Sequence, residues 1–204
     1  MKKFELTTKF ITNVAGKKLF RIKALVEFGN VKAGELGGYV EKEGNISQDG
    51  NAWVAGNACV DGNATVDGNA WVTGNTTVSG NATVTGNTKV SGNATVSGNA
   101  WVHGNAWVTD NTEVSGNATV SGNAEVSGNT DYALAQGFGT EFRCTTFYRG
   151  KNKKIMVNCG CFHGDLEEFR KQVKETRSGK IAKEYLMIAD LMEYHFASED
   201  SDDE

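Results

Sequence analysis

The chain has 204 residues with 25 glycines, no proline, four cysteines and a formal net charge of −4 at pH 7. This length allows one domain with appendages. It contains no apolar run of membrane-spanning length, and Met1 is followed by Lys2 and Lys3 without the apolar core of a secretory signal peptide, so we expect a cytoplasmic protein with reduced cysteines and no membrane contact.

Residues 1–43 predict a basic, strand-rich cap at the N-terminal end. Residues 3–8 and 18–28 are rich in Leu, Phe, Ile and Val, as expected for strands. Residues 31–40 contain three glycines and lead into the repeat region. A stack of strands that ends without a cover exposes its core and its strand edges, which is why a cap is expected here.

Residues 44–130 repeat the unit Gly-Asn-Ala-x-Val-x almost without interruption. A short fixed period is typical of a solenoid. Alanine and valine stand two positions apart, so they share one face of an extended strand and are expected to point inward. Glycine adopts a positive φ freely and asparagine does so more readily than most residues, so each Gly-Asn pair predicts a corner. Three strands and three corners then form a coil of about eighteen residues, and coils stack as parallel strands about 4.8 Å apart.

Residues 131–196 predict a small module of different composition. Residues 142–149 and 154–162 favour a hairpin that turns around residues 150–153. Asp165 and Glu168 have the spacing of a capping box at the start of a helix, and a second helix is expected over residues 180–196. The acidic residues 197–204 predict a disordered tail.

The segment GELGGYVEKEGNISQDGNAWVAGNACVDGNA, residues 34–64, resembles the YdcK-type hexapeptide-repeat β-solenoid proteins. The resemblance covers roughly residues 1–130. It implies a mainly β protein built on a left-handed parallel β-helix. It also implies a phage or prophage association. The segment CGCFHGDLEEF, residues 159–169, in addition resembles a C-terminal module of phage-type proteins. It implies no established catalytic residues.

Large side chains gather in one column of the predicted solenoid. Every eighteenth residue between alanine and valine stacks on one face, and this column contains Trp53, Trp71, Lys89, Trp107 and Glu125, while Trp101 belongs to another face. Outward tryptophans are costly when they are bare. We expect either that the C-terminal helices or another subunit cover them, or that they anchor a ligand or partner.

Two further groups are candidates for chemistry. His103 is the only histidine in the repeat, and it is either a surface residue beside Trp101 or the general base of a hexapeptide-repeat acyltransferase. Cys144, Cys159, Cys161 and His163 supply zinc-type ligands on the predicted hairpin. In a symmetric turn Cys144 lies opposite Cys159, which also allows a disulfide. The remaining alternative is that these cysteines are buried thiols.

These patterns favour a non-catalytic interaction module of phage type that acts on a host protein, with a host-defence inhibitor as one form of this role, through the tryptophan face or the C-terminal module. The alternatives are an acyl-CoA-dependent acyltransferase, by analogy of fold, and a small-ligand sponge. We expect a protein partner, a homo-oligomer (trimer or dimer) and no cofactor. Direct nucleic-acid binding is not expected, because residues 44–130 carry one lysine against six acidic residues.

Overall fold

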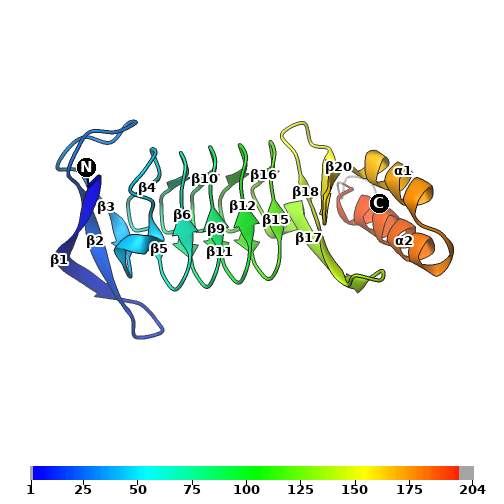
Figure 1. Ribbon diagram of the computed structural model, residues 1–204, viewed down its shortest axis with the longest axis horizontal. Coiled ribbons are helices and arrows are strands. Elements are labelled where there is room, and N and C mark those ends of the chain that lie inside the picture. Colours follow the sequence, from blue (N-terminus) through cyan, green and yellow to red (C-terminus); the bar gives the residue numbers. More distant parts are fainter. Residues whose placement is uncertain (1, 198–204) are drawn as a thin grey trace, which may run out of the picture.

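A computed structural model describes residues 2–197. The molecule is a rod with an N-terminal β cap at one end, a parallel β-solenoid in the middle, and an antiparallel sheet with two helices at the other end (Figure 1). This architecture confirms the predicted mainly β solenoid with a C-terminal hairpin-and-helix module. No helix among the described residues is both long and apolar enough to span a membrane. The predicted acidic tail lies, apart from Ala197, outside the described residues.

The N-terminal cap has three strands, β1 (Phe4–Thr12), β2 (Lys18–Ala24) and β3 (Leu36–Val40). Strand β3 lies in the segment that was expected only to lead into the repeat. It pairs antiparallel with β2 and parallel with β5, so it joins the cap to the first coil. Lys3 is almost fully buried, and its Nζ donates to the carbonyl oxygens of Asp49 and Ala52 at 3.2 and 3.0 Å. The cap therefore covers the polar backbone of the first coil as well as its apolar core.

The solenoid is built from strands of two residues that stack into three parallel sheets, with register partners eighteen residues apart. The short 3-10 helices η1 (Glu43–Asn45) and η2 (Asn129–Asp131) lie at its two ends. The strands are β4 (Trp53–Val54), β5 (Cys59–Val60), β6 (Thr65–Val66), β7 (Trp71–Val72), β8 (Thr77–Val78), β9 (Thr83–Val84), β10 (Lys89–Val90), β11 (Thr95–Val96), β12 (Trp101–Val102), β13 (Trp107–Val108), β14 (Glu113–Val114), β15 (Thr119–Val120) and β16 (Glu125–Val126).

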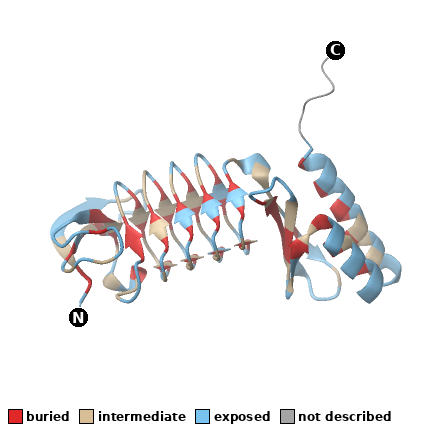
Figure 2. Cartoon of the chain, turned by 90° about the horizontal axis from the view of Figure 1, so that it is seen from above, coloured by how far each residue is buried: buried red, intermediate tan, exposed pale blue. Residues whose placement is uncertain are grey.

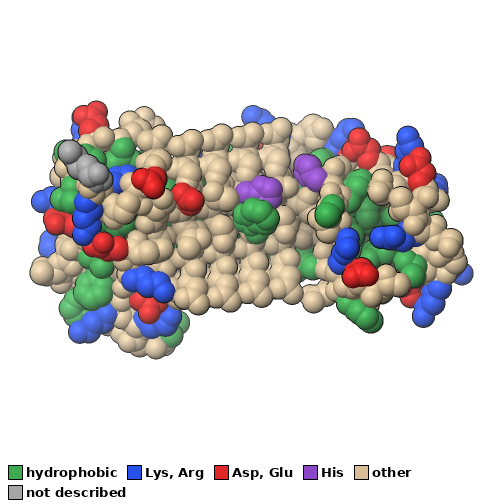
Figure 3. Space-filling view, viewed as in Figure 1, with side chains coloured by type: hydrophobic (Ala, Val, Ile, Leu, Met, Phe, Trp, Pro, Cys, Tyr) green, Lys and Arg blue, Asp and Glu red, His purple; other side chains and the backbone are tan. Residues whose placement is uncertain are grey.

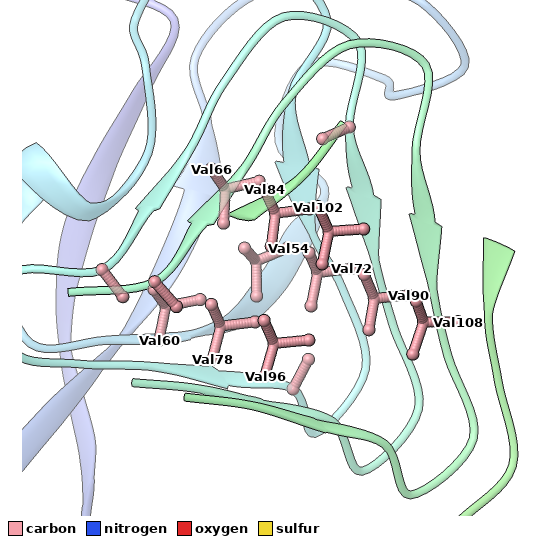
Figure 4. Close-up of a cluster of buried hydrophobic side chains, with 14 of the residues drawn as sticks. Val54, Val60, Val66, Val72, Val78, Val84, Val90, Val96, Val102 and Val108 are labelled. Atoms are coloured by element: carbon pink, nitrogen blue, oxygen red, sulfur yellow. The ribbon is translucent and has the colours of Figure 1, made fainter. Parts of the chain in front are cut away.

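The core of the solenoid consists of the repeated valines and alanines, as the period-two pattern predicts. The valines form inward-pointing columns from all three sheets (Figure 4) and are fully buried. Buried residues accordingly line the inside of the coils, whereas the helices are largely exposed (Figure 2). Each coil bonds to the next through its backbone, as in the 2.9 Å bond from the N–H of Trp53 to the carbonyl oxygen of Ala70.

At the corners, glycine and asparagine have different tasks, which corrects the expectation that both adopt a positive φ. The glycines take the left-handed conformation, and Asp110 at φ 57° is the one non-glycine corner residue that does so among the described coils. The asparagines instead stack in three ladders, in which the side-chain N–H₂ of one donates to the side-chain oxygen of the asparagine eighteen residues later.

The C-terminal module is a four-stranded antiparallel sheet, β17 (Tyr132–Phe138), β18 (Arg143–Arg149), β19 (Ile155–Cys159) and β20 (Phe162–Asp165), followed by α1 (Leu166–Thr176) and α2 (Gly179–His195). The predicted capping box is present, since Asp165 Oδ1 accepts from the backbone N–H of Glu168 at 3.0 Å and Glu168 Oε2 accepts from that of Asp165 at 2.8 Å. One face of the sheet meets the last coil, and the helices pack on the other face, so they lie at the end of the rod rather than along its side (Figure 1).

Candidate functional site

The predicted tryptophan column exists. Trp53 pairs with Trp71, Lys89 lies between Trp71 and Trp107, and Trp107 pairs with Glu125 in the next coil. These residues come from β4, β7, β10, β13 and β16, which form one flat sheet of the solenoid.

The column is not a continuous binding surface, because Trp53 is fully buried. Its ring meets those of Phe4 and Phe28 edge to face, with centroids 6.4 and 5.4 Å apart. The prediction that an outward tryptophan needs a cover therefore holds at this position. The cover, however, is the N-terminal cap and not the C-terminal helices or another subunit, and Trp53 is unable to contact a partner directly.

The other two tryptophans of the column differ in exposure. Trp71 is half-buried and packs against the core, whereas 47% of Trp107 is exposed. The Nζ atoms of Lys89 and Lys151 lie 5.5 and 5.9 Å from the centroid of the Trp107 ring. Lys89 follows from the register of the repeat, but Lys151 comes from the turn between β18 and β19. The turn lies beside Trp107, but the repeat pattern does not predict that position.

Trp101, on β12, lies on a different face of the solenoid and is 48% exposed. The ring of His103 lies against it at a centroid distance of 4.4 Å. The predicted neighbourhood of these two residues is thus observed. The middle of this face carries few charged groups, which gather toward the two ends of the rod (Figure 3).

Beside Trp101 and His103 there is a cleft of about 730 Å³ between the solenoid and the C-terminal sheet. It brings together Trp101 and four other residues singled out in the sequence, namely His103, Cys144, Cys161 and His163. The solenoid wall comes from β12 and from residues 119–122, and the opposite wall comes from β18, β19 and the turn before β20. The sequence did not predict that these residues lie together, because their proximity depends on how the C-terminal module docks on the solenoid.

A network of hydrogen-bonded polar side chains lies at the base of this cleft. Asn158 donates through Nδ2 to the backbone oxygen of Thr119 at 2.8 Å, and lies 3.0 Å from Ser121 Oγ and 3.1 Å from Tyr148 Oη. His163 Nδ1 is 2.8 Å from Asn158 Oδ1. No sequence pattern singles out Asn158, Ser121 or Tyr148, because each is a common residue type whose role appears only in three dimensions.

Burial favours the neutral forms of three titratable groups at the cleft, His103, Cys144 and Tyr148. Burial, followed by the nearby charge of His163, lowers the pKa of His103 below its usual value. Burial likewise raises the pKa of the Cys144 thiol and of the Tyr148 hydroxyl. Within residues 2–197 His103 has no hydrogen-bond partner that would orient its ring for proton transfer. The solenoid wall of the cleft is therefore an aromatic-edged surface without an acidic, lysine or arginine side chain, and Arg143 adds a cation on the opposite wall.

The predicted opposition of Cys144 and Cys159 is wrong by one residue, since Cys159 pairs with Thr145. A one-residue shift turns a side chain to the other face of a sheet, so Cys144 faces the solenoid cleft and Cys159 does not. Gly160, at φ 61°, reverses the chain into β20, so Cys159, Cys161 and His163 do not share one strand. Among the described residues no group of three potential ligands converges, and all four cysteines are free thiols.

The fold and surfaces define a parallel β-solenoid with capped ends and a cleft at its C-terminal junction. The YdcK Beta solenoid repeat family matches residues 89–104 and 114–129, which belong to the later coils. This match and the observed coils confirm the resemblance of the chain to YdcK-type β-solenoid proteins. A search of curated proteins finds no match to the chain.

Proposed function

We propose that this protein is a non-catalytic interaction module that binds a protein partner through Trp101 and the adjoining cleft. The proposal rests on the half-exposed indole of Trp101, which packs against the ring of His103 at the edge of the cleft. Tryptophan is enriched among residues that dominate binding energy, and such residues sit next to water-excluding neighbours. The solenoid wall of the cleft has no acidic, lysine or arginine side chain, which favours an apolar anchor, and Arg143 on the opposite wall offers a cation to the rim of the partner.

The scaffold supports this role because it is stiff. Each coil is tied to the next by backbone bonds, by the asparagine ladders and by the buried valines. A surface that is already ordered loses little conformational freedom when a partner binds. The resemblance to phage-type proteins supports a host protein in the cytoplasm as the partner.

The acyltransferase alternative has less support. A general base needs a pKa close to the working pH and a partner that orients it. His103 has a lowered pKa and, among the described residues, no such partner. The coils also carry no long projecting loop within residues 53–126 that would enclose an acyl-CoA. Measurable acetyl-CoA binding that His103→Ala abolishes would reverse this ranking.

The test uses Trp101 and Trp107 as matched variants, because the two are equally exposed on different faces of the solenoid. Partners captured from host-cell lysate by the full chain are identified, purified and titrated against wild type, Trp101→Ala and Trp107→Ala. We expect Trp101→Ala to weaken binding by about 2 kcal/mol, roughly 30-fold, and Trp107→Ala to leave it unchanged. Equal affinity of wild type and Trp101→Ala for every captured partner would remove the cleft from the proposal.

A further inference from the structure

We infer a second, independent site around Trp107 that binds a mononucleotide, with the base against the indole and the phosphate near lysine side chains. Trp107 is the most exposed tryptophan of its column, with 47% of its surface accessible, and the exposed lysines Lys89 and Lys151 are the side chains that lie over its ring. Aromatic side chains stack with nucleobases, and Lys89 and Lys151 provide cations at this indole.

The charges around Trp107 differ from those of the rest of the solenoid. Lys89 is the only lysine or arginine in residues 44–130, and neither it nor Lys151 makes an ion pair within residues 2–197. Lys153 and Arg149 lie along the same edge, where Arg149 Nε is 3.4 Å from an oxygen of Asp131. The remaining lysines thus form a cationic surface that a phosphate group is able to neutralise.

An asparagine ladder ends beside Trp107 and leaves one hydrogen-bond donor there, the Nδ2 group of Asn123. At this corner of the solenoid each side-chain Nδ2 donates to the next Oδ1, at 3.0, 2.9, 3.1 and 3.2 Å, in the order Asn51, Asn69, Asn87, Asn105, Asn123. All four bonds run in one direction, so the dipoles of the carboxamides add. The ladder ends at Asn123, whose Nδ2 has no acceptor within residues 2–197. A donor without a partner at the positive end of this row favours an anionic or carbonyl acceptor.

The shape of the surface fits one base rather than a strand. A hollow of about 130 Å³ is lined by Trp107, Lys151, Glu125 and the two last asparagines of the ladder. It adjoins a larger depression of about 590 Å³, which shares Glu125 and Lys151 and also contains Lys153 and Arg149. The base fits the smaller hollow and the phosphate extends toward the lysines. The Glu125 carboxylate, which repels phosphate, is placed to accept from an amino group of the base.

A longer nucleic-acid strand has no second stacking platform on this face. Trp71 is half-buried, Trp53 is covered, and the outward residues of the earlier coils provide no further cation besides Lys89. Strand binding needs several aromatic residues and a basic groove. The mononucleotide is therefore the ligand that matches both the single indole and the local charge.

The first experiment titrates the full chain at low salt with AMP, adenosine and inorganic phosphate, using calorimetry. We expect AMP to bind at least about 10-fold more tightly than adenosine or phosphate, because only AMP uses both the indole and the lysines. No binding of AMP, or equal binding of AMP and adenosine, would overturn the inference. A single-stranded oligonucleotide that binds far more tightly than AMP would overturn the assignment to a mononucleotide.

Matched variants locate the site. The double variant Lys89→Gln/Lys151→Gln is expected to lower AMP affinity to that of adenosine. The control Lys154→Gln, in the same turn but paired with Asp165 at 2.7 Å, should retain the wild-type affinity. An equal loss in both would mean a general charge effect and would contradict the site. These lysines are exposed, so the substitutions preserve the fold, which circular dichroism verifies.

Two further variants separate this site from the cleft. Trp107→Ala is expected to abolish AMP binding and Trp101→Ala to leave it intact, the reverse of the pattern expected for the protein partner. Asn123→Asp keeps the acceptor for Asn105 but loses the donor, and should abolish AMP binding. Asn111→Asp, at the end of another ladder, should not. Loss of AMP binding in Trp101→Ala alone would place the nucleotide in the cleft instead.

Discussion

At the scale of single residues, the cleft shows how burial and one neighbour set the state of a histidine. His103 is half-buried against Trp101, and His163 faces it from the C-terminal sheet. Both effects disfavour the imidazolium form. His103 is thus neutral near pH 7, and a neutral ring packs on an indole without the cost of desolvating a charge. This state suits an apolar contact surface better than proton transfer.

We predict that His163→Gln raises the pKa of His103 toward the usual value of about 6.5. The variant removes the charge that contributes to the shift and keeps a side-chain donor for Asn158. Because the unfolded chain binds the proton more readily than the native state, native stability falls as the pH drops below about 6.5, and this fall should be smaller in the variant. Histidine NMR titrations measure the pKa. An identical His103 titration in both proteins would contradict the predicted coupling.

At the scale of elements, the coils depend on glycines that lie directly above one another. At Gly74, φ is 82° and an added Cβ would stand 2.5 Å from the carbonyl oxygen of Gly92 in the next coil. At Gly116, φ is 68° but the nearest atom to a Cβ is Leu134 Cδ1 at 3.7 Å. A side chain at this repeat position therefore causes both backbone strain and a steric clash inside the stack, but only backbone strain at its end.

We predict that Gly116→Ala costs about 1–2 kcal/mol of unfolding free energy, the price of a left-handed conformation for a residue with a Cβ. Gly74→Ala should cost clearly more, because the next coil must also move away and lengthen its hydrogen bonds. Urea unfolding of the two variants and of wild type gives the comparison. If the two substitutions were equally destabilising, close stacking of the coils would not be the reason for glycine at these corners.

At the scale of the whole molecule, both ends of the solenoid are closed by parts of the chain outside the repeat. The C-terminal sheet satisfies the last coil through particular bonds: Thr119 N–H donates to Thr146 Oγ1 at 2.9 Å, and the N–H of Lys151 donates to the backbone oxygen of Asn123 at 2.9 Å. Without these partners the last strands would present open edges that pair with other chains.

We predict that a chain ending at residue 130 self-associates through its exposed last coil. Sedimentation velocity over a range of concentrations measures this, with the full chain as the control for any association that does not depend on the exposed end. The expected result is a concentration-dependent series of larger species in the truncated chain beyond those of the full chain. Matching sedimentation of the two chains would show that the last coil needs no cover.

The amino-acid sequence alone predicts the solenoid, its inward valines and alanines, and the eighteen-residue columns that place Lys89 beside Trp107. It also predicts the capping box at Asp165. These features depend on local periodicity and on residues close in the chain, so each repeat contains the information for its own conformation.

Which surfaces are accessible and which distant residues lie together depends on the tertiary fold. The N-terminal cap buries Trp53, the hairpin register separates Cys144 from Cys159, and docking of the C-terminal sheet brings His163 to His103 and Lys151 to Trp107. These contacts join residues far apart in sequence, and a shift of one residue in a strand reverses its faces. A repeat pattern contains no information about such contacts, because they depend on how non-repeating segments pack against the two ends of the rod.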